Sequence, residues 1–483
     1  MHFTVIARIL GLLLMLFSIA QLPSVGVALY YGEEDTLFTF IGAFVITFAV
    51  GLVVWLPFHG SKHDLRIRDG FMITVLFWIV LGFAGSLPLM LGTEPNLSFT
   101  DAVFESMSGL TTTGATVMTG LDDLPRSVLY YRQQLQWLGG IGIVVIAVAI
   151  LPMLGVGGMQ LYRAETPGPV KDSKLTPRIT QTAKALFNIY LVLTVACAGA
   201  YWWAGMSLFD AICHSFSTVA IGGFSTHDAS IDYFDSIAVE SICVFFMAVS
   251  GLNFGLHFHA LYRRSLAHYG RDPEAKMYFK IMAAGILITC SYLYFTGTYD
   301  AETSLRKGIF ELVSVMTTTG FATDNFAAWP TFLPFFLIFL SFFGACAGST
   351  GGGLKIGRML ILAKQGMREL YRLVHPNAVL PIKIRNRAIS DRIADAIWGF
   401  FGAYLAAYYL MVLLLLASGL EFVTAWSATA ACLNNLGPGL GEVAVHYGDI
   451  NSFAKWVLCG GMLLGRLEIF TLIVMCLPTF WRK

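Results

Sequence analysis

The chain has 483 residues, of which 56% are hydrophobic and 13% charged, and its net charge is +1. A soluble chain carries about a quarter charged residues, so this composition excludes an ordinary soluble protein and indicates a membrane protein. The near-zero net charge also excludes a global basic field for nucleic acid. The eight cysteines lie mostly in apolar segments without C-x-x-C spacing, which indicates buried side chains rather than disulfides or a metal site.

Long apolar runs predict ten transmembrane helices. These runs cover residues 4–30, 37–57, 71–92, 128–155, 183–205, 236–262, 277–296, 331–354, 393–418 and 452–480. Shorter, partly polar helices are expected near residues 100–110, 208–218, 305–316 and 422–433. Such short helices cannot cross a hydrocarbon core of roughly 30 Å, so we expect them to be re-entrant. The predicted fold class is an all-α polytopic membrane protein with ten transmembrane and four re-entrant helices.

The distribution of lysine and arginine predicts the orientation. With a cytoplasmic N-terminus, segments 58–70, 156–182, 263–280 and 355–387 face the cytoplasm, and together they hold twenty lysines and arginines. The opposite loops hold Arg126, Arg306 and Lys307 alone. This is the positive-inside pattern, and it holds only if the four short helices do not cross the membrane. Both termini are then expected in the cytoplasm.

Each short helix leads into a segment that ends in glycine. Thr-Thr-Thr-Gly at 111–114 recurs at 317–320, and residues 220–223 and 434–437 are divergent copies. Aligning the helices that start at Asp101 and Asp210 makes Gly223, not Gly222, equivalent to Gly114.

Fourfold repetition predicts four quasi-equivalent helix–pore-loop–helix units around one central axis. We expect two additional N-terminal helices in residues 1–70. The four units are expected at residues 71–160, 161–262, 263–375 and 376–483.

These segments suit a cation filter. A dehydrated alkali cation needs several oxygen ligands, which rings of backbone carbonyls can supply. Glycine permits the backbone angles that aim successive carbonyls to one side. We therefore predict the filter glycines to be Gly114, Gly223, Gly320 and Gly437. The ion-binding carbonyls are predicted at Thr112, Thr113, Ile221, Gly222, Thr318, Thr319, Asn435 and Leu436.

A glycine-rich run at residues 348–353 lies at the end of one apolar segment. It lacks the G-x-x-x-x-G-K-[ST] spacing of a phosphate loop and follows no strand. We interpret it as flexible backbone beneath the filter, with close helix packing as the alternative. Arg466, in the last apolar run, either pairs with a carboxylate or lies near the ion path. The residues that we expect beneath the filter are Gly348, Ser349, Thr350, Gly351, Gly352, Gly353 and Arg466.

Two glutamates occupy equivalent places in the first and third short helices. Glu105 and Glu311 each precede their filter glycine by nine residues. We expect them to form hydrogen bonds behind the filter rather than to contact the ion. The sequence contains no nucleophile–base arrangement that would indicate an enzyme.

Five segments resemble the integral membrane subunit of the bacterial Trk/Ktr potassium uptake systems, in the Trk branch. They are TTTGATV at 111–117, IGGFSTHDAS at 221–230, GACAGSTGGGLK at 344–355, LNNLGPGLGE at 433–442 and GRLEIF at 465–470. The resemblance implies potassium as the transported ligand, no covalent cofactor, one pore per chain and a homodimer in the bacterial inner membrane. It also implies a gate at the glycine-rich run and a cytosolic, nucleotide-binding regulatory subunit of the Trk-A type. The basic run 355–387 is either its docking surface or a purely topogenic segment.

The predicted function is potassium uptake through a carbonyl-lined filter. Proton- or sodium-coupled potassium symport on the same scaffold remains open. A secondary carrier for a small organic solute is the alternative of a different class. That class predicts paired intramembrane charges or a twofold repeat, whereas this chain shows a fourfold one. Affinity, ion coupling and the regulating nucleotide do not follow from the sequence.

Overall fold

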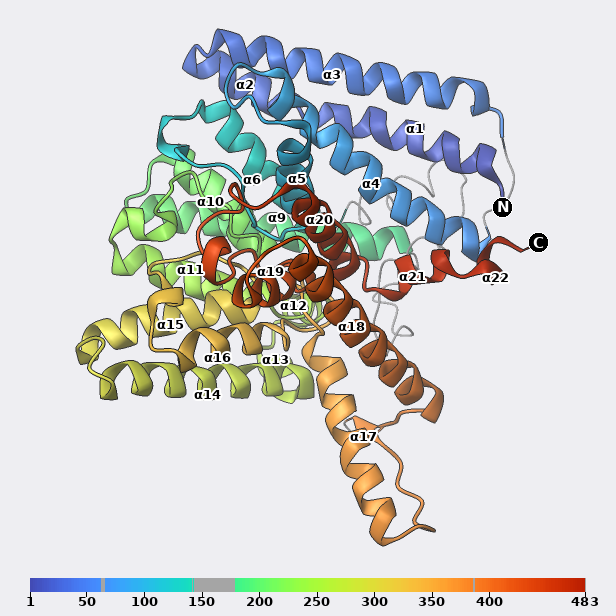
Figure 1. The fold of residues 1–483 in the computed structure, drawn as a ribbon, viewed down its shortest axis with the longest axis vertical. Coiled ribbons are helices and arrows are strands. Elements are labelled where there is room, and N and C mark those ends of the chain that lie inside the picture. Colours follow the sequence, from blue (N-terminus) through green and yellow to red (C-terminus); the bar gives the residue numbers. More distant parts are fainter. Residues whose placement is uncertain (62–65, 141, 143–178, 385–386, 483) are drawn as a thin grey trace.

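The computed structural model describes residues 1–61, 66–140, 142, 179–384 and 387–482 (Figure 1). This part of the chain is mostly helical, which confirms the all-helical class. Its one sheet is a short antiparallel ladder of β1 (Lys383–Ile384) with β2 (Arg387–Ala388).

The N-terminal helices pack on one side of the bundle. α1 (Phe3–Ile19) and α2 (Leu22–Tyr31) form one apolar span, which lies against α3 (Glu34–Trp55). A Cβ added to Gly11 would lie 2.7 Å from the carbonyl oxygen of Gly51, so the two backbones are in direct contact. Small residues allow this close approach between membrane helices, where hydrophobicity alone gives little attraction.

The rest of the described chain divides into four successive sets of helices, and in each set one helix leads into a Gly-ended segment: α5, α10, α15 or α19. The first set is α4 (Ile67–Leu91), α5 (Phe99–Leu110) and α6 (Arg126–Gly140). The second is α9 (Ile179–Trp203), α10 (Leu208–Ala220), α11 (Ile237–Ser250) and α12 (Phe254–Tyr262). The third is α14 (Pro273–Phe295), α15 (Ala301–Thr317), α16 (Phe332–Ser341) and α17 (Ile356–Val374), preceded by α13 (Ala267–Arg271). The fourth is α18 (Asp391–Ala417), α19 (Phe422–Leu433), α20 (Ser452–Arg466) and α21 (Phe470–Cys476), followed by α22 (Pro478–Trp481).

Three of the predicted uninterrupted helices are broken. α11 and α12 meet at 94°, and α20 and α21 meet at 115°. The helix expected over 331–354 ends at Ser341, and irregular backbone follows until α17. The first two breaks were missed because apolar composition continues through them. The third includes the glycine-rich run 348–353, which the sequence already indicated as flexible backbone, but it begins earlier, after Ser341. Each break instead forms hydrogen bonds with other units, as described below.

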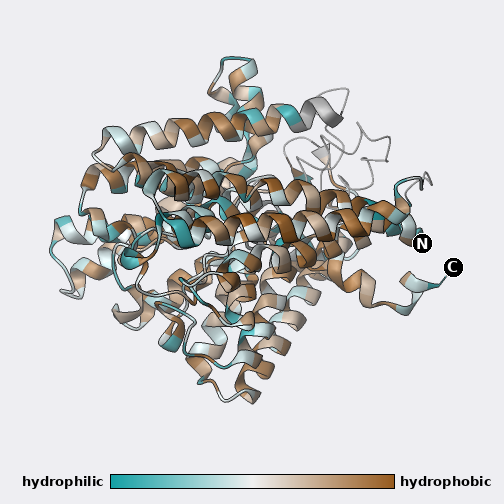
Figure 2. Ribbon diagram, turned by 90° about the horizontal axis from the view of Figure 1, so that it is seen from above, coloured by the Kyte–Doolittle hydropathy of each residue, from teal (hydrophilic) through white to brown (hydrophobic). Residues whose placement is uncertain are grey.

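Six described helices are long and apolar enough to cross a membrane, and eight if each bent pair is one span. The predicted run 128–155 is described only as far as residue 142, so its second half lies outside the described residues. Many large apolar side chains on the long helices are exposed, among them Val53, Val195 and Leu287. Figure 2 shows that apolar residues dominate the long helices along their lengths, as expected where lipid replaces water.

The N-terminus and the C-terminus lie on the same side of the molecule (Figure 1). Arg68, near the start of α4, donates a hydrogen bond to the carbonyl of Phe480 over 3.3 Å, which ties the C-terminal segment to the first unit. α17 and the β1–β2 ladder project away from the bundle (Figure 1).

Candidate functional site

The first two short helices begin in the same way. Ser98 and Ser207 are their N-cap residues, and each serine oxygen accepts from the backbone N–H three residues on, at Asp101 and Asp210. Each serine hydroxyl also donates to the aspartate side chain over 2.7 Å. The repeated aspartate therefore belongs to the N-cap, where a negative charge also favours the helix dipole.

All four short helices end in the same left-handed turn. The residue two before each filter glycine has positive φ, with values of 53° at Thr112, 56° at Ile221, 66° at Thr318 and 55° at Asn435. The next residue donates its N–H to the carbonyl five residues earlier. These bonds are Thr113 to Ser108 (2.9 Å), Gly222 to Ser217 (2.9 Å), Thr319 to Ser314 (2.8 Å) and Leu436 to Ala431 (2.7 Å).

This hydrogen-bond pattern is a Schellman motif, in which glycine usually takes the left-handed position. Here threonine, isoleucine and asparagine take it, and a β-branched residue at positive φ is strained. Such strain persists only where the surroundings enforce it, and it concentrates at functional sites. The four equivalent φ values also place Gly223, not Gly222, in the position of Gly114.

The four filter glycines form a closed ring. A Cβ added to Gly114 would overlap the carbonyl oxygen of Gly222, and one at Gly223 would overlap that of Thr319. A Cβ at Gly320 would overlap the carbonyl oxygen of Leu436, and one at Gly437 would lie 2.7 Å from that of Thr113. Each glycine therefore contacts the carbonyl group of the residue before the glycine of the next unit. The contacts run from the first unit to the second, third and fourth, and from the fourth back to the first.

This ring requires glycine for two reasons. All four glycines have positive φ, and a side chain would collide with the neighbouring segment. The eight predicted ion-binding residues therefore meet at one place. All eight are buried.

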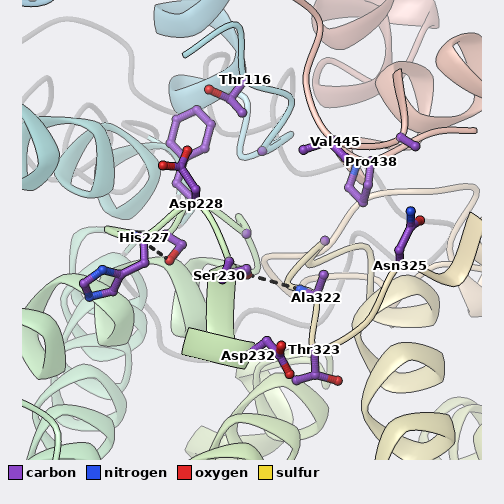
Figure 3. Close-up of a pocket in the computed structure, with 18 of the residues that line it drawn as sticks. Thr116, His227, Asp228, Ser230, Asp232, Ala322, Thr323, Asn325, Pro438 and Val445 are labelled. Carbon is purple, nitrogen blue, oxygen red and sulfur yellow. Dashed lines mark hydrogen bonds between the residues drawn. The ribbon is translucent and has the colours of Figure 1, made fainter. Parts of the chain in front are cut away.

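One cavity of about 370 Å³ opens above the ring, and all four glycines line it. Figure 3 shows that its wall is built from four separate stretches of the chain, around Thr116, Asp228, Thr323 and Pro438. Its charged lining residues are Arg132, Asp228, Asp232, Lys307 and Asp324.

Cross-links between neighbouring units hold this cavity together. Lys307 donates to Asp232 over 2.6 Å, and the Ser230 hydroxyl accepts from the N–H of Ala322 over 3.2 Å (Figure 3). The N–H of Tyr447 donates to the carbonyl of Thr116 over 2.7 Å, which joins the fourth unit to the first. These hydrogen bonds join the second unit to the third and the fourth unit to the first.

Behind the ring, polar side chains of three short helices bind the segment that follows the glycine of their own unit. Glu105 accepts from the N–H of Val117 over 2.9 Å, and Glu311 accepts from the N–H of Thr323 over 2.6 Å. In the fourth unit, Ser427 accepts from the N–H of Leu440 over 2.8 Å. The two glutamates thus form hydrogen bonds behind the ring, in keeping with their equivalent positions in the sequence.

The two glutamates differ in charge compensation. Glu105 forms a buried ion pair with Arg132 at 2.8 Å, and Arg132 also donates to the carbonyl of Ser225. Glu311 has no described cationic partner, and its Oε2 has no hydrogen-bond partner among the described residues. Sequence reasoning missed Arg132, because its partner lies 27 residues away on another helix.

The glycine-rich segment lies directly beneath the ring. The Thr350 hydroxyl donates to the carbonyl of Val219 over 3.0 Å, and the N–H of Gly352 donates to the Thr318 hydroxyl over 2.7 Å. The N–H of Gly353 donates to the carbonyl of Asn434 over 3.1 Å. The segment therefore contacts the ends of three short helices.

Arg466 joins this segment to the remaining unit. Its guanidinium donates to the Thr112 hydroxyl over 3.2 Å and to the carbonyl of Thr350 over 3.0 Å. It also donates to the carbonyls of Gly139 and Gly140. The neighbouring Glu468 instead pairs with Arg358. Arg466 therefore lies beside the ring, in contact with both Thr112 and the glycine-rich segment.

The basic run 355–387 is not a uniform exposed surface. Lys355 is buried and donates to the carbonyl of Gly351. Arg358 and Arg368 are also largely buried, and they pair with Glu468 and Asp391. These three cations thus have structural partners, and an expected docking surface at this run cannot include them.

The fold and the site together define a class: a helical membrane protein in which four Gly-ended segments surround a ring of backbone carbonyls. The model of the TrkH family, described as cation transport protein, matches residues 36–483. The chain belongs to this family, which confirms the resemblance seen in the sequence.

Individual relatives match over the full length. The chain is 57% identical to the Trk system potassium uptake protein TrkH of Halomonas elongata and 54% identical to that of Escherichia coli, with 100% of each chain covered. The crystal structure of the potassium transporter TrkH from Vibrio parahaemolyticus matches with a TM-score of 0.91 and 52% identity, over 100% of both chains.

Proposed function

We propose that this chain takes up potassium ions across a bacterial inner membrane through the ring of four Gly-ended segments. The observation that carries the proposal is the cyclic fit of each filter glycine against the carbonyl before the next one. A closed fourfold ring of backbone oxygens suits a monovalent cation that has shed its water. The full-length relatives are named as potassium uptake proteins, which supports potassium as the ion.

The ion ligands are the main-chain carbonyls of the two residues before each glycine. These are Thr112, Thr113, Ile221, Gly222, Thr318, Thr319, Asn435 and Leu436. Backbone that alternates between left-handed and ordinary angles, as at residues 112–114, can turn successive carbonyls to one side. The C-terminal ends of the four short helices lie at the ring, and their partial negative charge favours a cation there.

Residues 348–353 and Arg466 form a gate beneath this filter. Their hydrogen bonds to Val219, Thr318, Asn434 and Thr112 support the assignment, because a segment held against all four units lies across the ion path. Glycine-rich backbone has the freedom to leave this position.

The topology is ten transmembrane and four re-entrant helices with both termini in the cytoplasm. The lysine and arginine asymmetry supports it, as does the location of both termini on one side (Figure 1). We assign the two N-terminal helices to residues 1–70 and the pore units to residues 71–160, 161–262, 263–375 and 376–483. The order of the helix sets supports four units, but α4 already begins at Ile67, and residue 160 lies outside the described residues. The assembly is a homodimer that binds a cytosolic nucleotide-binding subunit, and the exposed Lys364 and Lys383 belong to the surface that meets it.

Growth rescue tests the proposed function. The chain is expressed in a bacterial strain that lacks its own potassium uptake systems, and growth is measured at low potassium with and without an imposed proton gradient. Restored growth that depends on potassium supports the proposal, and a strict dependence on the proton gradient identifies symport. Failure to restore growth while the protein is present in the membrane contradicts potassium uptake.

A further inference from the structure

We propose that Glu274 is a positioning residue that clasps both ends of the glycine-rich segment and holds it under the filter. The inference rests on the proposed gate and adds the residue that keeps it in place. One oxygen of this carboxylate, Oε1, accepts the N–H of Ala347 over 2.7 Å and the N–H of Gly357 over 2.9 Å. The two donors lie ten residues apart, one before residues 348–353 and one after them.

Glu274 is free to reach across because its own helix is capped by another residue. Asp272 is the N-cap of α14, and its Oδ1 accepts from the N–H groups of Glu274 and Ala275, both at 3.0 Å. The Glu274 side chain is therefore not needed for the first turn of α14. It crosses instead to the segment between α16 and α17.

The start of α17 needs an external acceptor. Its N-cap residue, Lys355, forms no side-chain cap bond and has a strained φ of 72°. The first N–H groups of a helix have no acceptor within the helix, and negative charge is favourable there. The carboxylate of Glu274 supplies both a hydrogen-bond acceptor and a negative charge at the N–H of Gly357. A Cβ added to Gly357 would lie 2.9 Å from Glu274 Oε1, so glycine allows this contact.

The break between α11 and α12 supports the same segment. The N–H of Cys346 donates to the carbonyl of Gly251 over 2.9 Å, and the N–H of Phe254 donates to the carbonyl of Gly348 over 3.0 Å. These bonds hold only the first part of the segment. Glu274 joins its beginning to its end through one side-chain atom, beside the backbone bond from the N–H of Ile356 to the carbonyl of Ala345 over 3.2 Å. Its loss therefore loosens the segment at both ends.

A native thiol reports on the position of the segment. Cys346 adjoins Ala347, and its side chain is 1% exposed. It reacts with a thiol reagent only when the segment moves away. The full-length protein is used with the other seven cysteines replaced, and the rate of Cys346 modification is measured in detergent. Potassium flux is measured after reconstitution into liposomes.

Glu274→Ala is expected to raise the rate of Cys346 modification by about tenfold or more, since it removes two charge-assisted hydrogen bonds, and to raise potassium flux. Glu274→Gln keeps an oxygen that can accept both N–H groups, so it should stay close to the unmodified protein in both assays. Glu302→Ala, at an exposed first-turn glutamate of α15, is the matched control and should change neither.

The two assays distinguish the role of Glu274 in holding the segment, called the clasp, from the role of the segment as a gate. Faster modification with unchanged flux supports the clasp and contradicts the gate. An unchanged modification rate in Glu274→Ala overturns the clasp, whatever the flux. If Glu274→Ala does not fold, as judged by gel filtration, Gly357→Ala replaces it, since its methyl group pushes against the same oxygen. An unchanged rate in that variant likewise overturns the proposal.

Discussion

Arg466 donates a hydrogen bond to the hydroxyl of Thr112 over 3.2 Å. This contact links the last unit to the first, directly beneath the carbonyl ring, and the same guanidinium also holds the carbonyl of Thr350. A fixed positive charge at this place repels cations, and its hydrogen bonds keep the glycine-rich segment in position.

Replacing Arg466 with glutamine is therefore expected to increase potassium flux. The hydrogen bond to the Thr350 carbonyl is the one that holds the segment, and its loss, at about 1 kcal/mol, together with the loss of the charge corresponds to roughly a tenfold increase. Flux is measured in liposomes, with Arg306→Gln as the control, because Arg306 is bound to Glu240 and Asp235 on a different part of the surface. Lower flux in a protein that is properly folded would contradict a role beside the ion path.

Shortening the segment 346–353 is expected to open the path below the filter. A shorter chain cannot reach Val219, Thr318 and Asn434 together, so the contacts with the three short helices are lost. We expect higher potassium flux at a normal protein level. Equal or lower flux, with protein in the membrane confirmed by immunoblot, counts against a gate here.

The two buried glutamates should differ in their contribution to stability. Glu105→Ala leaves the buried guanidinium of Arg132 without its ion-pair partner, which costs about 3–5 kcal/mol. Glu311→Ala leaves neutral donors without an acceptor, namely the N–H groups of Thr323 and Asp324 and the Thr323 hydroxyl, which costs about 1–3 kcal/mol.

Thermal unfolding in detergent measures the difference between these two variants. The melting temperature should fall further for Glu105→Ala than for Glu311→Ala. The opposite order would show that the ion pair is not what makes Glu105 important.

His227 makes the outer wall sensitive to pH. Burial lowers its pKa, but hydrogen bonds and charge from Asp210 and Asp122 raise it, and the net shift is upward from about 6.5. The rings of His214 and Tyr233 stack on the imidazole of His227. A raised pKa means that the protonated form stabilises the fold fully below about pH 6.5. This stabilisation is lost as the pH rises through the higher folded-state value.

The melting temperature should therefore decline as the pH rises above about 6.5, and His227→Gln should remove that part of the decline. His59→Gln, at an exposed histidine on the end of α3, is the control and should leave the decline intact. A His227→Gln profile that runs parallel to that of the unmodified protein would exclude this histidine as the titrating group.

The repeated features of the chain could be predicted from its sequence, and the contacts between repeats could not. The alignment from Asp101 and Asp210 was sufficient to align Gly223 with Gly114, because local motifs repeat with the local structure. By contrast, the pair of Asp101 with Lys455 joins residues 354 positions apart. Such a pairing depends on how the four units close, and no pattern within one unit reports it.

The helix breaks could not be predicted from the sequence for a related reason. Residues 467–469 read as part of an apolar run, yet Glu468 and Ile469 have φ values of 53° and 38°. Their strained backbone is maintained by tertiary contacts such as the pair of Glu468 with Arg358. Glu274 was overlooked similarly, because it stands at the start of an ordinary helix and acts on a segment more than seventy residues away.

Ion selectivity after Gly320→Ser tests the central claim most directly. The added Cβ would overlap the carbonyl oxygen of Leu436, so the ring must open or turn a carbonyl away. Gly297→Ser is the matched control, since Gly297 has a φ of 68° but no atom within 4 Å of an added Cβ. We predict that Gly320→Ser admits sodium along with potassium while Gly297→Ser keeps the original selectivity. Unchanged discrimination between potassium and sodium in folded Gly320→Ser would contradict the carbonyl ring as the filter.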